Sequence, residues 1–472
     1  MPKNRRFDNE GFLGLGVRHF QAFLIFFGIS AAYALRANLS VALVAMTDNA
    51  ANADFEQYDW HEKAKSVILS SFFWGYILTQ VPGGALAKKY GGKMVLFYGI
   101  SICSVLTILT PICAKIGGWQ LVCALRVIQG LSQGLIFPST HTLLSKWAPV
   151  EDRGNFTTYC YSGMQFGTMV MMATSGVIAS SAMGWPGIFY LSGGLGVIWS
   201  IMWFIWGAST PAVSNLISLE EKKFIEQSVG LTSADTHSTA QLRTPWSKFL
   251  TSVPFFALLL THSANSWGFW TLLTEIPSYM KNVYGVNIKS SALVSALPYL
   301  VNFLLCFVFS GISSVLDRNK CMSLNVSRKV FNSIGFWIPM VSLIVLGYVG
   351  ANETSLAIAL ITVTIGINAS TYLGFHGNHI DLSPNFAGIL MGITNCAANI
   401  MSILAPLVVG VIVSDEKNPD QWHIVFFIAS GFYFVGNLVF IIFGSTEVQS
   451  WNNPHPLPSL EIRNTAHLEL QH

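Results

Sequence analysis

Two arginines occur inside stretches of the sequence that are otherwise apolar. Arg36 lies within 18–46 and Arg126 within 119–143, and Tyr33 shares a helical face with Arg36. An arginine at the centre of a bilayer costs on the order of 2.5 to 3.5 kcal/mol by insertion scales, so it usually faces the interior of a helix bundle and serves a function. Its forked donors match carboxylate and phosphate. We therefore expect all three residues at an anion site, although either arginine could instead pair with polar groups and lock one conformation.

Three polar residues follow Arg126 at spacings that suit one helical face. On a helix that advances about 100° per residue, Gln129, Gln133 and His141 fall within roughly 60° of Arg126. The two glutamines are candidates for orienting the arginines at the substrate site, and they could equally serve helix packing. His141 lies nearer the end of its span, where we expect a hydrogen bond that gates the site.

Polar residues also gather on the spans of the second half of the chain. Tyr372 is expected to contact the substrate, and the span that begins near residue 355 places it on one helical face with Asn368 and His379. Glu275 is a candidate cation or proton site because ionisable residues inside a membrane are usually functional. The residues of this half expected to serve gating or coupling are Asn265, Glu275, Asn368, His379, Asn395 and Asn399.

His379 and Asp381 together could suggest the dyad of a membrane enzyme. Their position at the end of a helix favours a structural cap or latch instead. The sequence contains no Gly-rich phosphate loop, no cluster of metal ligands and no nucleophile beside a base. We therefore expect a protein that is not an enzyme and needs no cofactor, and the sequence leaves its metal content open.

The composition indicates which elements must position these residues. Hydrophobic residues make up 52% of the 472 residues, charged residues make up 10%, and the mean hydropathy is +0.51. These values exclude a soluble globular protein. The chain divides into twelve apolar segments of about twenty residues or more, each long enough to cross a bilayer of roughly 30 Å as a helix. No segment alternates as a membrane strand does, so the fold expected is an all-α polytopic membrane protein.

The loops and basic residues predict the organisation of the chain. The longest polar stretch, 210–250, separates two groups of six spans. We expect a cytosolic N-terminus (1–17), two six-helix halves (18–209 and 251–445) with 210–250 as a cytosolic linker, and a cytosolic tail (446–472). Lys and Arg are more frequent in the loops that this arrangement places in the cytosol. No removable signal peptide is expected.

Several blocks of the sequence resemble known transporters. The turn with Lys88, Lys89 and Lys93 resembles the loop between helices two and three of the major facilitator superfamily, although Lys88 stands near the place of its usual acid. A narrower resemblance, to the anion transporter family of the type I sodium/phosphate cotransporters, sialin and the vesicular glutamate transporters, extends over about 18–451. The blocks that carry it are RANLSVALVAM, SSFFWGYILTQVPGG, RVIQGLSQGLIFPSTHTLLSKWAPVEDRG, TPWSKFLTSVP and NHIDLSPNFAGILMGITN.

The resemblance implies roles for individual residues. Arg36 and Arg126 match arginines implicated in anion recognition, and His141 matches the family's histidine on span four. Gln129 and Gln133 stand where proton-coupled members carry glutamates, and amides do not exchange protons at physiological pH. The resemblance to the glutamate transporters is weaker in detail, because Asn265 replaces their arginine on span seven and Leu69 replaces their histidine on span two.

These observations lead to one expectation and two alternatives. We expect a secondary active transporter of inorganic phosphate, small organic anions or both, coupled to sodium, that works by alternating access. The alternatives are a carrier of sialate, urate or acidic amino acids driven by protons or by the membrane potential, and a membrane anion sensor that does not transport. The partners expected are a small anion, co-transported Na⁺ and the lipid bilayer, without nucleic acid. The protein is expected to be a monomer, in the plasma membrane rather than in a vesicular or lysosomal membrane.

Overall fold

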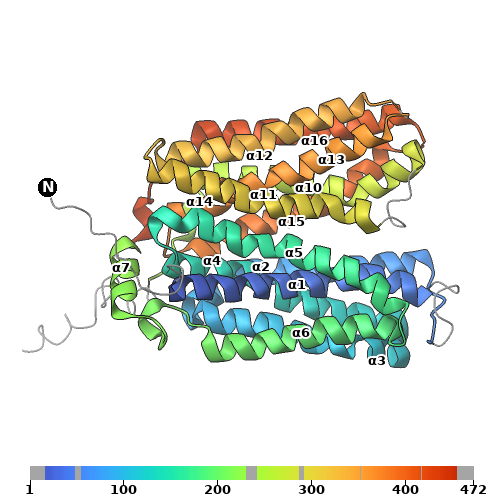
Figure 1. The fold of residues 1–472 in the computed structure, drawn as a ribbon, viewed down its shortest axis with the longest axis horizontal. Helices are drawn as coiled ribbons and strands as arrows, with labels where there is room; N and C mark the ends of the chain where they lie inside the picture. The colour runs from blue at the N-terminus through green and yellow to red at the C-terminus, as the bar shows by residue number, and fades with distance from the viewer. Residues whose placement is uncertain are drawn as a thin grey trace, which may run out of the picture.

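The protein is a bundle of long helices that run along one axis (Figure 1). The computed structural model describes residues 16–47, 55–229, 242–285, 292–350, 352–415 and 417–453, and in these ranges it contains helices and no strand. The side chains of a few residues within helices, among them Glu275, lie outside the description.

The first half of the bundle contains six elements that follow one another in sequence. They are α1 (Val17–Thr47), α2 (Glu62–Tyr90), α3 (Gly92–Gln133), α4 (Ile136–Trp147), α5 (Arg153–Ala179) and α6 (Gly184–Trp206). Gly118 interrupts α3 with a φ of 57° and a ψ of −154°, a conformation that a side chain would strain. The chain therefore turns back within α3, which carries all of predicted span three and the beginning of span four.

The second half is arranged in the same way and lies beside the first (Figure 1). Its main helices are α10 (Val253–Tyr284), α11 (Ala292–Arg318), α12 (Leu324–Gly347), α13 (Thr354–Ile367), α14 (Phe375–Leu382), α15 (Ala387–Ile412) and α16 (Pro419–Phe443). Eight helical stretches of the described chain are long and apolar enough to span a membrane, and two of them are the joined helices α3–α4 and α13–α14. The joined pair α3–α4 supplies two spans, and with α2, α5 and α10 the elements match the twelve predicted spans, so the predicted fold class is confirmed.

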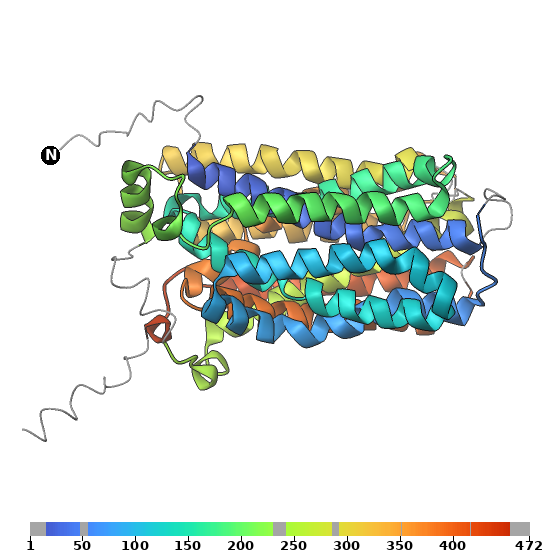
Figure 2. The same ribbon diagram turned by 90° about the horizontal axis from the view of Figure 1, so that it is seen from below.

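The connection between the halves includes a short helix at one end of the bundle. This helix, α7 (Leu219–Val229), lies outside the bundle beside the start of α1 (Figures 1 and 2). The buried Glu221 carboxylate accepts hydrogen bonds from the backbone N–H groups of Val17 at 2.8 Å and Arg18 at 3.1 Å. A carboxylate at this position satisfies free donors and complements the helix dipole. We call this end of the bundle, where α2 ends and α5 begins, the linker end.

The predicted continuous helix on span four is interrupted between Gln133 and Ile136. The Thr79 hydroxyl of α2 donates a hydrogen bond to the Leu131 carbonyl at 2.8 Å, and the Leu135 N–H bonds to the Ser132 carbonyl instead. A side chain inserted into the backbone ladder is a common cause of a helix break. The helix that was predicted to run without a break from Arg126 to His141 is therefore interrupted after Gln133.

Predicted span ten is also broken, so its polar residues do not share a single face. A 3-10 segment, η5 (Asn368–Tyr372), follows α13, and Gly374 then leaves helical geometry with a ψ of −116°. The Asn332 side chain of α12 accepts a hydrogen bond from the Phe375 N–H at 3.3 Å and thereby caps the new helix α14. Short 3-10 segments within a helix often mark functional positions.

Candidate anion-binding site

Arg36 lies among aromatic side chains that come from both halves. Its guanidinium carbon is 4.8 to 5.6 Å from the centres of five rings, distances at which a cation is attracted to an aromatic face. The rings belong to Tyr33 of α1, to Phe72, Phe73 and Tyr76 of α2, and to Trp270 of α10. The structure thus brings predicted Tyr33 to Arg36, and Trp270 contributes from the second half.

Arg126 approaches the same place from α3. Its guanidinium carbon is 4.8 Å from the centre of the Phe72 ring, and its side chain donates a hydrogen bond to the Gln129 amide oxygen at 3.1 Å. Gln129 in turn donates to the Thr107 hydroxyl at 3.1 Å and so links Arg126 to the part of α3 that precedes Gly118. Arg126 is 4% exposed.

Both arginines retain donors that are not used. The Nη2 atom of Arg36 and the Nε atom of Arg126 are buried and have no hydrogen-bond partner, and neither side chain forms an ion pair with a carboxylate in the described part of the chain. A buried charged donor without a partner is costly, which favours a site that takes an anion. An anion between these groups would receive two guanidinium charges.

Gln133 does not bind either arginine. Its side-chain nitrogen donates to the Ala32 carbonyl of α1 at 3.0 Å and contacts the Cys103 sulfur at 3.2 Å. These contacts tie the helices around the site together. The contacts therefore favour a different role for each glutamine: Gln129 orients Arg126, whereas Gln133 serves helix packing.

Polar contacts next to the arginines join the two halves. The Asn395 amide of α15 donates to the Tyr76 hydroxyl at 3.2 Å and to the Gln80 amide oxygen at 2.9 Å. Asn399 donates to the Asn395 carbonyl of its own helix at 2.7 Å. Asn395 therefore reaches α2 beside the ring cage, whereas Asn399 bonds within α15.

Tyr372 and Asn368 face different neighbours. The Tyr372 hydroxyl accepts a hydrogen bond from Gln165 of α5 at 3.5 Å, which places it between the halves. Asn368 donates to the Asn265 amide oxygen at 2.8 Å, so these two predicted residues pair with each other inside the second half. The Glu275 side chain lies outside the described residues.

Histidines form a second polar group between the halves. His141 of α4 donates from Nε2 to the His376 carbonyl of α14 at 3.0 Å, and its Nδ1 accepts a hydrogen bond from the Tyr161 hydroxyl at 2.8 Å. His379 also donates to the His376 carbonyl at 3.0 Å. The position of His141 across the boundary between the halves suits the predicted gate.

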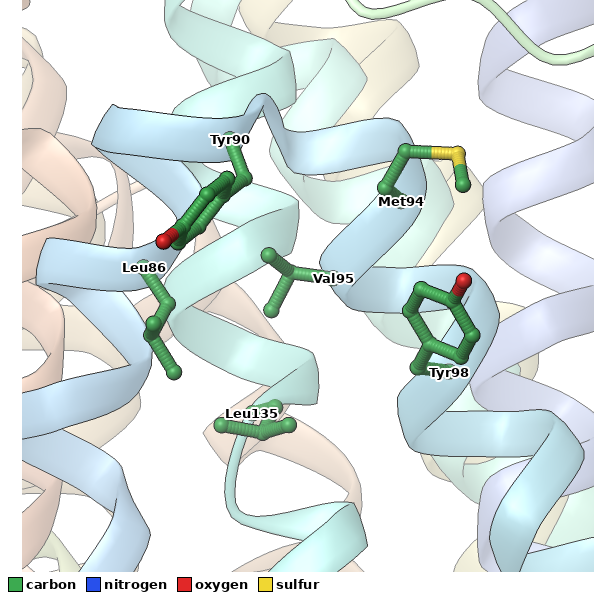
Figure 3. A pocket seen from close by; sticks show the side chains of 6 residues that line it. All are labelled: Leu86, Tyr90, Met94, Val95, Tyr98 and Leu135. Atoms are coloured by element: carbon green, nitrogen blue, oxygen red, sulfur yellow. The ribbon is translucent and has the colours of Figure 1, made fainter.

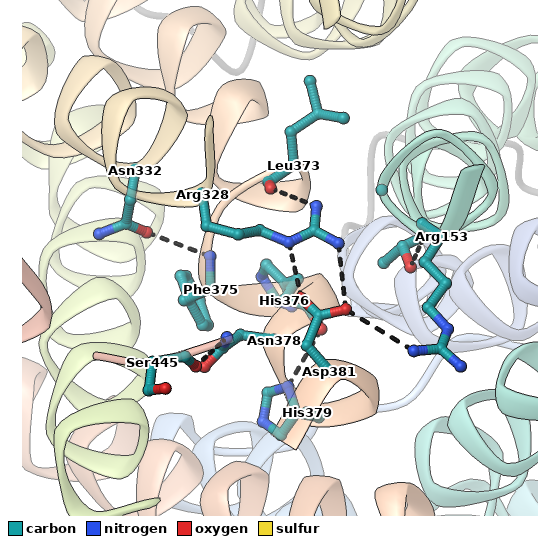
Figure 4. A network of polar contacts seen from close by, with 12 residues as sticks. Arg153, Arg328, Asn332, Leu373, Phe375, His376, Asn378, His379, Asp381 and Ser445 are labelled. Atoms are coloured by element: carbon teal, nitrogen blue, oxygen red, sulfur yellow. Dashed lines mark hydrogen bonds and ion pairs between the residues drawn. The ribbon is translucent and has the colours of Figure 1, made fainter. Parts of the chain in front are cut away.

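The Asp381 carboxylate connects three helices at the linker end (Figure 4). Arg328 of α12 contacts both of its oxygens, from Nε at 2.8 Å and from Nη2 at 3.4 Å, and Arg153 of α5 lies 4.0 Å away from the first half. Arg328 also donates to the Leu373 carbonyl at 2.7 Å. Asp381 is thus a member of a buried ion-pair network, which agrees with a latch rather than with an enzyme dyad.

Known proteins are similar to this chain over most of its length. The model of the major facilitator superfamily matches residues 25–406. The chain belongs to this superfamily. Among solved structures, it is similar to the major facilitator proton:xylose symporter XylE bound to 6-bromo-6-deoxy-D-glucose, with a TM-score of 0.68, 15% identity, and coverage of 91% of this chain and 98% of that one. The likeness to XylE shows the fold.

Relatives within the superfamily are more similar in sequence. The chain is 40% identical to a Drosophila ananassae protein described as "Putative inorganic phosphate cotransporter", over 94% of this chain and 96% of the relative. It is 37% identical to human sialin (92% and 90%) and 34% identical to the Xenopus tropicalis vesicular glutamate transporter 1 (93% and 77%). This facilitator therefore belongs to the type I phosphate cotransporter family, whose members are membrane transporters rather than enzymes, and the predicted recognition is confirmed.

A cavity of this facilitator lies apart from the arginines. It has a volume of about 390 Å³ and an apolar lining on α2, α3 and the turn before α4 (Figure 3). The residues that line it are Leu86, Tyr90, Met94, Val95, Tyr98 and Leu135. None of the predicted site residues is among them, and the lining offers no charge to an anion.

Several residues of the site could not be singled out from the sequence. Trp270 and Phe72 are two of many aromatic residues in apolar segments, and only the packing shows that both contact Arg36. His262 and His376 carried a usable signal, because they are ionisable residues within predicted spans. His262 lies 3.1 Å from the Thr394 hydroxyl, which also contacts His379 at 2.7 Å.

Proposed function

We propose that this facilitator is a secondary active transporter that carries a small anion by alternating access, with Arg36 and Arg126 as the cations that hold it. The observation that carries the proposal is the approach of both guanidinium groups to the Phe72 ring with buried donors unused. The names of the relatives, a phosphate cotransporter, sialin and a glutamate transporter, support an anion as the cargo.

For the substrate, we propose inorganic phosphate, a small organic anion or both. Phosphate is supported by the 40% identity to the Drosophila relative. The ring cage supports an organic anion as a second candidate, because aromatic faces around Arg36 would pack against an apolar body. Either anion fits the forked donors of arginine.

For the driving force, we propose a sodium gradient. The group that contacts Arg126 is the Gln129 amide, which does not titrate, so this position offers no route for a coupled proton. Residence in the plasma membrane as a monomer, with both termini in the cytosol, is part of the same proposal. The distribution of basic residues between the loops supports the cytosolic position of the termini.

The proposal is tested in proteoliposomes. Uptake of radiolabelled phosphate, urate, sialate and glutamate is measured in parallel, with sodium and with sodium replaced. We expect sodium-dependent uptake of at least one anion, loss of that uptake in Arg126→Ala, and normal uptake in Arg318→Ala, a control at an exposed arginine. Uptake without sodium would replace sodium coupling by a proton or potential-driven mechanism. Binding of an anion without uptake or counterflow would establish a sensor and refute transport.

A further inference from the structure

We infer that Arg153 forms a second anion-binding site at the linker end, which takes the transported oxyanion once the two halves separate there. The inference rests on the proposed function, because it needs an anion that passes from the Arg36–Arg126 site to this end. The ligand is a carboxylate or a phosphate, the chemistry that the first site also selects.

The charges at this end do not balance. Arg153 and Arg328 share the single carboxylate of Asp381, so two positive charges and one negative charge leave one net positive charge. The Arg153 side chain is 3% exposed, and its Nε and Nη2 atoms are buried without a hydrogen-bond partner. A guanidinium group in this state has donors available for an oxyanion.

The neighbouring acid of the same loop does not neutralise Arg153. Burial raises the pKa of the Asp152 carboxyl, and the charge that opposes this rise comes from Arg18. Among the described residues, the carboxylate that pairs with Arg153 is Asp381 of the other half. The neutralisation of the Arg153 charge therefore depends on a contact that separation of the halves would break.

The two arginines hold Asp381 unequally. Arg328 belongs to the same half as Asp381 and contacts both carboxylate oxygens, whereas Arg153 reaches across the boundary with one contact at 4.0 Å. Gly154 leaves room for the Arg328 side chain beside α5, because a Cβ there would lie 2.6 Å from Nη1 of Arg328. When the halves part, Asp381 stays with Arg328, and Arg153 becomes an unpaired cation in the opening.

The position of Arg153 suits an anion on its way out. Gln165, which contacts Tyr372 near the centre of the bundle, lies twelve residues further along the same helix (165 minus 153). At 1.5 Å per residue this separation is about 18 Å. An anion that leaves the Arg36–Arg126 site toward the linker end would therefore meet a further cation there, Arg153 at the start of α5.

The test measures affinity from each side of the membrane. Half-saturation concentrations are determined in sealed vesicles of both orientations, with radiolabelled phosphate and with whichever of urate, sialate and glutamate the wild-type protein carries. For Arg153→Gln we expect the half-saturation concentration on the linker side to rise roughly tenfold or more, because one charged hydrogen-bond partner of the anion is lost. On the opposite side we expect a change within about twofold. In Asp381→Asn the half-saturation concentration on the linker side should stay at the wild-type value or fall, because Arg153 is then unpaired.

These variants distinguish an anion site from a mere latch. If Arg153 acts only by pairing with Asp381, the two variants will change the two sides alike, and that result overturns the inference. A linker-side value in Arg153→Gln equal to that of the wild-type protein also overturns it. If Arg153→Gln does not reach the membrane, Arg153→Lys decides: its single ammonium lacks the planar fork, so a raised linker-side value supports the site and an unchanged one refutes it. A wild-type protein that carries none of the four anions refutes the proposed function itself.

Discussion

Arg36 and Arg126 lie against the same aromatic ring, with guanidinium carbons 5.1 and 4.8 Å from the centre of Phe72. They reach this ring from α1 and α3, helices that are separated by α2 in the sequence. Phe72 is fully buried, so it fixes the spacing of two cations that would otherwise repel each other. An anion placed beside it would neutralise both charges.

The first prediction concerns this ring. Phe72→Leu keeps an apolar side chain but removes the aromatic face, which is worth about 0.5 to 2 kcal/mol to a cation. We expect the half-saturation concentration for anion uptake to rise about threefold to tenfold. Phe443→Leu, at a phenylalanine that is 50% exposed, is the control and should leave it unchanged. An equal effect of both substitutions would show that Phe72 acts only in general packing.

The second prediction concerns the amide beside Arg126. Gln129→Glu puts a carboxylate within 3.1 Å of the guanidinium, so a fixed negative charge would neutralise the cation that serves the anion. We expect weak uptake throughout pH 5.5 to 8, because the adjacent guanidinium favours the charged form of the new carboxyl group. The measurement is initial uptake over this range, with Gln129→Asn as the uncharged control. Uptake at the level of the wild-type protein would contradict this account of Arg126.

The third prediction concerns the hydrogen bond between Tyr161 and His141. Tyr161→Phe removes the hydroxyl that donates to Nδ1 of His141 at 2.8 Å. The His141 ring, which binds the His376 carbonyl of the other half, is then less firmly held. A hydrogen bond contributes roughly 1 kcal/mol, so we expect about fivefold faster amide exchange in α14. Tyr159→Phe on the same helix is the control. Unchanged exchange in α14 would show that His141 does not hold the linker end closed.

The fourth prediction concerns the contact between α7 and α1. Glu221→Gln removes the charge that caps the first helix, a change expected to cost about 0.5 to 2 kcal/mol and to lower the thermal midpoint by a few degrees. Glu220→Gln, at the exposed neighbouring residue, should leave the midpoint unchanged. If both variants melt like the wild-type protein, the cap does not contribute to stability.

The sequence predicts the spans and the two central cations, because both depend on local chemistry. A run of apolar residues of membrane length forms a helix whatever its neighbours are, and Arg36 and Arg126 stand out from such runs. The pairing of Gln129 with Arg126 also follows from helical spacing, since the two residues are three positions apart.

The breaks and the contacts between halves depend on residues far apart in the sequence. Span ten is interrupted where Asn332 of another helix caps Phe375, and α3 ends where Thr79 bonds to Leu131. His141 binds a backbone carbonyl, a group that every residue carries and that no sequence pattern marks. Arg153 resembles any basic residue at a membrane edge until the structure places it near Asp381.

The most direct test of the shared anion site is a double-substitution cycle on Arg36 and Arg126. Half-saturation concentrations for anion uptake are measured in Arg36→Lys, Arg126→Lys and the double variant, with the amount in the membrane determined for each. Because both cations bind one anion, we predict that each single change weakens affinity roughly tenfold or more and that the double change is less than the product of the two. Wild-type affinity in either single variant, or effects that multiply independently, would contradict a site in which the two arginines hold the same anion.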